Sequence, residues 1–125
     1  MTQEQKDLLL KDLCSRLPYG VKFVIDNDRN NVRTLTGIDE AIPYEDWQMC
    51  AFARGVSAIP IEDIKPYLFP LSSMTAEQKT SHNFLKHSAY ANPIKLVDWY
   101  NKNHFDYRGL IPMGLAIDAT GKDIY

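Results

Sequence analysis

The chain has 125 residues, of which 45% are hydrophobic and 24% are charged, and its formal net charge is −2. This is the length of one ordinary domain, and the composition is that of a folded rather than a disordered protein. We therefore expect a single globular domain over residues 1–125, with no need for a metal ion or disulfide. No two Lys or Arg residues are adjacent, so a nucleic-acid partner is not expected.

The ends and the cysteines give a consistent cellular context. Cys14 and Cys50 are too few and too far apart for a disulfide framework or a zinc site. The first residues, MTQEQKDLLLKDL, are too charged for a signal peptide. No apolar run approaches the ~18 residues of a membrane span. These features predict a cytoplasmic protein that has no membrane partner.

The first expected element is a helix over residues 2–17. Thr2 and Gln5 have the spacing of a capping box. Apolar residues then recur at steps of three and four and form one stripe: Leu9, Leu10, Leu13, Cys14 and Leu17. The stripe predicts that Cys14 is a small buried hydrophobe rather than a reactive thiol.

Short strands should follow the helix. Residues 21–26 alternate with a period of two, residues 26–31 (DNDRNN) have turn composition, and residues 31–38 resemble an antiparallel partner strand. Residues 46–54 are apolar on both faces, which predicts a central or helix-covered strand. Three prolines in residues 57–71 favour short extended pieces at a sheet edge.

The second half is predicted to be helical. Residues 75–87 repeat the capping-box spacing and are mostly polar, with Phe84 and Leu85 as anchors of a surface helix. Asn92-Pro93 starts a helix over residues 93–103 that is apolar around most of its circumference. Such a helix should be covered on more than one side, by the sheet and by another subunit in a homo-oligomer.

This order of elements predicts an α+β domain. We expect a small antiparallel sheet or a partly closed β-barrel, flanked by an N-terminal helix and two to three C-terminal helices.

The search for chemistry gives few candidates. His82 and His87 are five residues apart and lie on different faces of a helix, so no metal site is expected. Ser73 is better placed to start a helix than to act as a nucleophile. There is no Gly-x-Ser-x-Gly motif and no glycine-rich phosphate loop. We therefore assign no catalytic residue, metal or cofactor, and expect a protein that is not an enzyme.

The stretch HFDYRGLIPMGL, residues 104–115, admits two interpretations. In the structural one, which we favour, it is a corner: Asp106 caps the next turn, and Arg108 pairs with Asp106 or with carbonyl groups. In the functional one it is a wall of an anion or nucleotide site, with Arg108 as a phosphate fork and Tyr107 as a stacking face. The candidate ligand-binding residues are Arg108, Tyr107, His104, Tyr67 and Lys65.

Three strings, KDLCSRLPYGVKF, IKPYLFPLSSMT and NKNHFDYRGLIPMGLAI, span most of the chain. In them the chain resembles a family of short proteins encoded in gut-bacterial genomes, often within prophages and mobile elements. Members of that family often carry arginine where Phe69 stands, and they have longer strand regions. The resemblance implies a small phage or mobile-element accessory protein. It implies no catalytic or binding residue.

Three functions remain open at this point. The first is a non-enzymatic binding protein that sequesters a nucleotide-derived signal of host defence. The second is an inhibitor or adaptor that binds a host protein, which predicts an exposed apolar patch and no small-molecule pocket. The third is a small hydrolase or nuclease that uses His104, Asp106 and Arg108, which would have to converge in one cleft.

Overall fold

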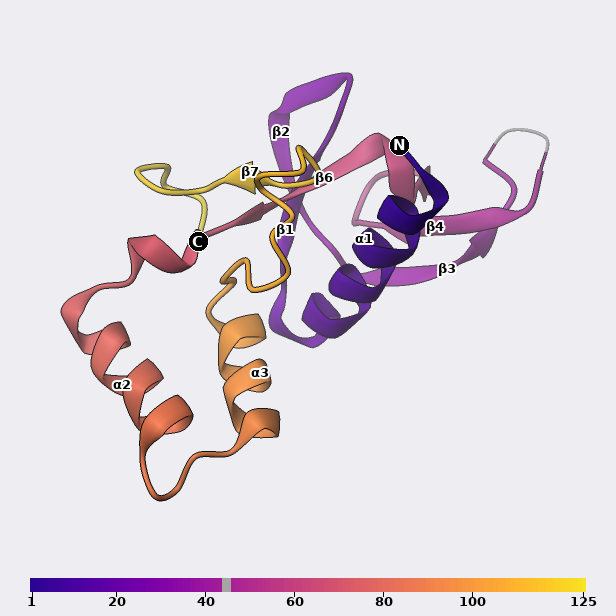
Figure 1. Cartoon of the computed structure of the whole chain (residues 1–125). Helices are drawn as coiled ribbons and strands as arrows, with labels where there is room; N and C mark the ends of the chain where they lie inside the picture. The colour runs from indigo at the N-terminus through magenta and orange to yellow at the C-terminus, as the bar shows by residue number, and fades with distance from the viewer. Residues whose placement is uncertain (44–45) are drawn as a thin grey trace.

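The computed structural model describes residues 1–43 and 46–125, and the chain folds as an α+β domain (Figure 1). The helices are α1 (Gln3–Arg16), α2 (Ala76–His87) and α3 (Pro93–Lys102). The strands are β1 (Lys22–Ile25), β2 (Asp28–Thr34), β3 (Gly37–Ala41), β4 (Gln48–Phe52), β5 (Ile59–Pro60), β6 (Ile64–Leu68) and β7 (Ile117–Asp118). Short 3-10 turns occupy Leu17–Tyr19, Ile61–Asp63 and Leu71–Ser73.

The described strands form two small open sheets rather than a barrel. One has the order β2-β1-β6-β7 and the other the order β3-β4-β5. All pairs are antiparallel except β6 with β7. The main core lies between α1 and these sheets, and its largest fully buried apolar side chains are Leu9, Leu13, Phe23, Ile64, Leu68 and Leu110.

Helix α1 begins as predicted, but its buried stripe differs from the predicted one. Thr2 and Gln5 form the capping box. The buried positions are Leu9, Asp12, Leu13 and Arg16, which follow steps of three and four. Cys14 lies outside this stripe and is exposed, so the prediction of a buried Cys14 was wrong. Asp12 and Arg16, rather than the predicted Leu10 and Cys14, complete the buried stripe with Leu9 and Leu13.

Two strand predictions also need correction. Residues 31–38 do not form one strand, because β2 starts at Asp28 and Gly37 begins β3. The sheet-edge prediction for residues 57–71 is confirmed for β5, the last strand of its sheet, but is wrong for β6, which lies between β1 and β7. Residues two apart in a strand direct their backbone N–H and C=O groups to the same side. The backbone groups of Pro66 therefore face β7, as do those of Leu68, which pairs with Asp118 on β7. Residue 66 precedes the paired segment on that side, so the missing N–H of Pro66 breaks no ladder hydrogen bond.

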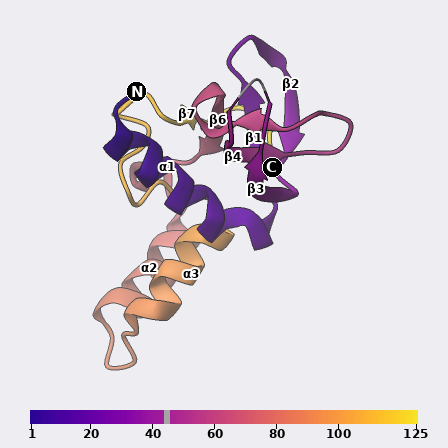
Figure 2. The ribbon, with the colours of Figure 1, turned by 90° about the vertical axis from the view of Figure 1, so that its right-hand side faces the viewer.

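Helices α2 and α3 form a two-helix arm, residues 75–102, that projects from the sheets (Figures 1 and 2). The Thr75 and Gln78 side chains form the predicted capping box of α2, and the Asn92 side chain accepts hydrogen bonds from the first amides of α3. Within this chain α3 is covered less than expected, because Ile94 and Val97 stay exposed. No helix in the described part of the chain is long and apolar enough to cross a membrane.

Candidate functional site

The segment that follows α3 is a corner fixed by its own side chains. Asp106 is buried, and its two carboxylate oxygens accept hydrogen bonds from the amides of Leu110 and Ile111 at 2.8 and 2.9 Å. The backbone of residues 104–106 also pairs with Phe69, whose amide donates to the His104 carbonyl and whose carbonyl accepts from the Asp106 amide. The predicted capping role of Asp106 is therefore present, and it commits this carboxylate to the backbone.

A buried charge network joins this corner to α1. Arg16 and Asp12 are completely buried, and the Arg16 Nε donates to Asp12 Oδ2 at 2.8 Å. The Arg16 Nη2 donates to Asp12 Oδ1 and to the carbonyl of Phe105. Arg108 reaches the same carboxylate from the corner, with its Nη1 at 2.9 Å from Asp12 Oδ1. One carboxylate thus holds two guanidinium groups, and it is Asp12 rather than the predicted Asp106 that pairs with Arg108.

Tyr107 lies against both guanidinium groups of this network. The Arg108 Cζ is 4.6 Å and the Arg16 Cζ 5.4 Å from the centre of its ring. Its other neighbour is Tyr100 of α3, whose ring stacks on it at a centroid distance of 5.1 Å. The aromatic face that was predicted to stack a nucleotide base therefore already contacts cations and another ring of the same chain.

His104 is held by a different set of contacts. It has a left-handed backbone with φ of 61°, and its ring stacks on Tyr125 at a centroid distance of 3.7 Å. The Tyr125 hydroxyl donates to the carbonyl of Tyr67 and accepts from the amide of Lys22. Burial and the nearby charges of Arg16 and Lys22 lower the pKa of His104 to about 4, and burial raises the pKa of Tyr125 to about 12. Both rings are neutral at physiological pH.

The five predicted ligand-binding residues thus separate into two groups. Arg108 and Tyr107 lie against α1, whereas His104 and the carbonyl of Tyr67 meet at Tyr125. Lys65 is two residues from Tyr67 on β6, where it pairs with Val24 of β1. Within the described residues, no hydrogen bond, ion pair or ring contact joins the first group to the second.

The sequence analysis missed Asp12, Arg16 and Tyr125. A signal was present for the first two, because an Asp and an Arg four residues apart can pair along a helix. Asp12 lies between Leu9 and Leu13, and Arg16 follows Leu13 by three residues. This spacing would have placed the pair on the buried stripe. Nothing comparable marked Tyr125, since its contacts are with β1, β6 and His104, which are distant in sequence.

An aromatic series connects this corner to the arm. The rings follow one another in the order Tyr125, Phe69, Phe105, Trp99 and His82, with centroid distances between 5.4 and 6.4 Å. The His82 Nε2 also lies 2.7 Å from the Tyr100 hydroxyl, which ties α2 to α3. Burial raises the pKa of Tyr100 and, with the charges of Lys86 and His87, lowers the pKa of His82. These rings anchor the arm to the body.

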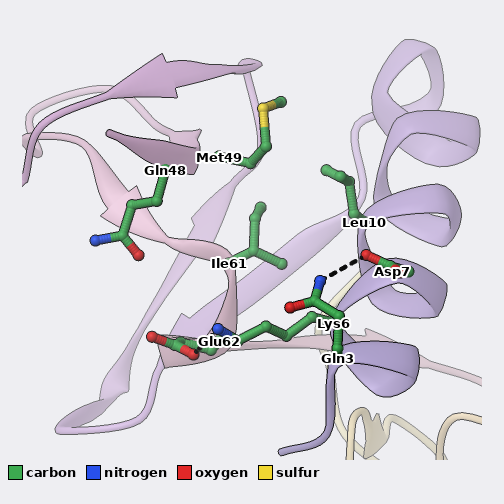
Figure 3. Close-up of a pocket in the computed structure, with 8 residues that line it drawn as sticks. All are labelled: Gln3, Lys6, Asp7, Leu10, Gln48, Met49, Ile61 and Glu62. Atoms are coloured by element: carbon green, nitrogen blue, oxygen red, sulfur yellow. Dashed lines mark hydrogen bonds and ion pairs between the residues drawn. The ribbon is translucent and has the colours of Figure 1, made fainter. Parts of the chain in front are cut away.

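Among the hollows in the described part of the chain, the first two considered lie on the body of the protein. The first, between α1 and β4, has a volume of about 220 Å³ and an ion pair of 2.7 Å between Lys6 and Glu62 at its rim (Figure 3). That is below the ~300 Å³ at which small-molecule pockets begin. The second has a volume of about 530 Å³, and its lining includes Asp63 and Asp26, the latter in an ion pair with Arg29 at 3.4 Å.

The third hollow lies on the arm, between α2 and α3. It is a wide groove of about 440 Å³ lined by Thr80, Ser81, Phe84, Leu85 and Trp99. Phe84 is 53% exposed and stacks on Tyr90, which is 77% exposed, and Ile94 of α3 is 76% exposed. Large apolar side chains are thus accessible on the arm, while charged side chains are buried at the corner.

Among the residues that the structure describes, no group of three or more His, Cys, Asp or Glu side chains could hold a metal ion. No protein-family model, curated protein or solved structure matches the chain. The resemblance to short gut-bacterial and prophage proteins therefore stays a prediction, and the function has to be argued from the geometry alone.

Proposed function

We propose that this protein is a non-enzymatic binding protein that docks on another protein through its α2–α3 arm. The observation that carries the proposal is the exposure of Phe84, Tyr90 and Ile94 on the arm. Together they present on the order of 400 Å² of apolar surface, judged from the area of such side chains. The largest apolar patch on a typical monomer is about 300–600 Å², and such patches are often functional.

The rest of the arm supports the same function. Helix α2 has no fully buried residue, so it contributes little to the core. Nevertheless, both arm helices carry complete N-terminal caps, and the His82–Tyr100 contact holds them together. An arm that is well formed but barely buried is suited to presenting side chains to a partner.

The corner favours binding over catalysis. The hydrolase hypothesis needs His104, Asp106 and Arg108 in one cleft with free hydrogen-bonding groups. Asp106 instead caps backbone amides, Arg108 pairs with Asp12, and the His104 ring stacks on Tyr125. In the mobile-element context that the resemblance implies, the partner would be a cytoplasmic host protein, and the binding would inhibit or redirect it.

A photocrosslinking experiment tests the proposal. A photoreactive phenylalanine analogue is placed at position 84 on the arm or at Val32 on β2, an exposed apolar position of the body. We expect a discrete protein adduct from position 84 in cells that express the chain, and none from position 32. Adducts that are the same from both positions, or absent from both, would contradict docking through the arm.

The sequestration of a nucleotide-derived signal stays a separate prediction with its own test. A panel of nucleotides and cyclic nucleotides is titrated while the melting temperature is followed, since a ligand that binds the folded state raises it. We expect no shift, because Arg108 is committed to Asp12. A saturable shift that Arg108→Ala removes would replace protein docking by nucleotide binding as the proposed function.

A further inference from the structure

The groove between α2 and α3 is lined by side chains of both helices. Two rows of α2 side chains, Thr80 with Phe84 and Ser81 with Leu85, form one wall, because residues four apart share a helix face. Trp99 of α3 forms the other wall. Its ring is held from behind by His82 and Phe105, at centroid distances of 5.9 and 5.4 Å. The groove therefore has an apolar floor that is fixed before any partner binds.

The rim of the groove on α3 is basic. Lys95 and Lys102 are four residues before and three residues after Trp99, which places both on the helix face that carries Trp99. Both are exposed, and neither forms an ion pair with any residue that the structure describes. On the α2 side, Glu77 lies in the row of Phe84, seven residues earlier.

The arm as a whole is basic in an otherwise acidic protein. Four lysines and two carboxylates give residues 75–102 a net charge of +2, which leaves −4 for the rest of the chain. On the α3 side of the groove, the positive charges are those of Lys95 and Lys102. A partner that carries carboxylates beside its apolar side chains has the complementary charge.

We propose that the groove binds an acidic amphipathic helix of a partner protein, with a large apolar side chain between Phe84 and Trp99 and carboxylates facing Lys95 and Lys102. Insertion of an amphipathic helix into an apolar groove is a common mode of peptide recognition. The inference rests on the proposed function, because it specifies the partner of the same arm. It also predicts that binding weakens as salt screens the lysines.

The test uses Trp99 as an internal reporter. The chain has two tryptophans, and Trp47 precedes β4, away from the arm (Figure 1), so Trp47→Phe leaves Trp99 as the only one. The protein is titrated with two helical peptides that lack tryptophan and share one leucine face, one flanked by glutamates and the other by lysines. We expect the acidic peptide to change the Trp99 emission saturably, and the basic peptide to bind at least tenfold more weakly.

Two charge reversals on the arm provide the matched comparison. Lys95→Glu with Lys102→Glu should weaken the acidic peptide at least tenfold. Lys79→Glu with Lys86→Glu makes the same change of charge on α2, five residues before and two residues after Phe84. These positions do not share the Phe84 face, so affinity should change by less than about threefold.

The outcomes separate this inference from the proposed function. If both peptides bind equally, the acidic character of the partner is wrong while docking in the groove stands. If neither peptide binds but position 84 still crosslinks to a protein, the partner is not an acidic helix and the proposed function stands. If dilution from high concentration reveals a dimer that Phe84→Ser abolishes, the occupant is a second copy of this chain, and the inference is overturned.

Discussion

The corner and the arm depart in opposite ways from the usual placement of side chains, because the corner buries charged side chains and the arm exposes apolar ones. At the corner, Asp12 and Arg16 are completely buried and Asp106 nearly so. On the arm, Phe84, Tyr90 and Ile94 face solvent. Buried charges that are paired and hydrogen-bonded fix one arrangement of the chain, and the Asp12, Asp106 and Arg108 side chains are engaged in this way. Exposed apolar groups do little for folding and are available to a partner. The polar residues of residues 104–108 thus contact other parts of the same chain, whereas the exposed side chains on which the proposed docking rests are apolar.

The largest expected effect comes from removing the shared carboxylate of the corner. Asp12→Asn leaves two guanidinium groups without their counter-ion, and we expect the free energy of unfolding to fall by about 3–5 kcal/mol. Urea denaturation measures this change. Asp7→Asn is the control on the same helix, because Asp7 is exposed and accepts only from the Gln3 side chain. Equal small losses in both variants would show that the corner is not held by its charges.

Arg108→Ala should have the next largest effect. It removes the hydrogen bonds to Asp12 and to the Ser15 hydroxyl, and we expect a loss of about 2 kcal/mol, as is usual for bonds to charged groups. The crosslinking yield from position 84 should be unchanged after the loss of stability is taken into account. A variant that keeps its full stability but loses the crosslink would move the binding site from the arm to the corner.

A further effect is expected on the pH dependence of stability. Folded His104 takes up a proton only near pH 4, whereas in the unfolded chain a histidine takes one up near pH 6.5. Between these pH values the unfolded chain binds more protons than the folded chain. The stabilisation that comes from keeping His104 neutral is therefore fully present above about pH 6.5 and is lost as the pH falls toward 4. His82, whose pKa is also lowered, adds a loss in the same direction.

Replacing His104 separates its contribution from that of His82. Asparagine tolerates the positive φ of this position and does not titrate, so His104→Asn should flatten the fall in melting temperature between pH 6.5 and pH 4, although it loses the stacking on Tyr125. An unchanged pH profile in His104→Asn would mean that His104 is protonated freely in the folded protein.

The difference between the two regions also explains what the sequence could predict. The α+β class and the caps of all three helices follow from local signals: the two Thr and Gln pairs and Asn92-Pro93. The corner was favoured as a structural element, and Asp106 caps the turn as expected. Local patterns show which residues can cap a helix or form an apolar stripe. The helix caps and the Asp106 cap depend only on such patterns, so the sequence could predict them.

The remaining features depend on contacts between segments that are distant in sequence. The Arg108 partner lies 96 residues away on α1, and the face of His104 is covered by Tyr125 from the end of the chain. The apolar residues of α3 were expected to be covered, since periodicity cannot say whether a partner segment is present. Their exposure on the arm is the observation on which the proposed docking rests, and it is seen only in the folded structure.

The most direct test of the account substitutes the exposed aromatic pair of the arm. Phe84→Ser with Tyr90→Ser should change the free energy of unfolding by less than about 0.5 kcal/mol, as expected for exposed positions. Because position 84 is now substituted, the photoreactive analogue is placed at position 94. The two substitutions should abolish crosslinking from that position. The measurement is the adduct yield at position 94 with and without the substitutions, at matched folded protein. The account predicts that the adduct disappears while the fold is kept. An adduct of undiminished yield would contradict the arm as the docking surface.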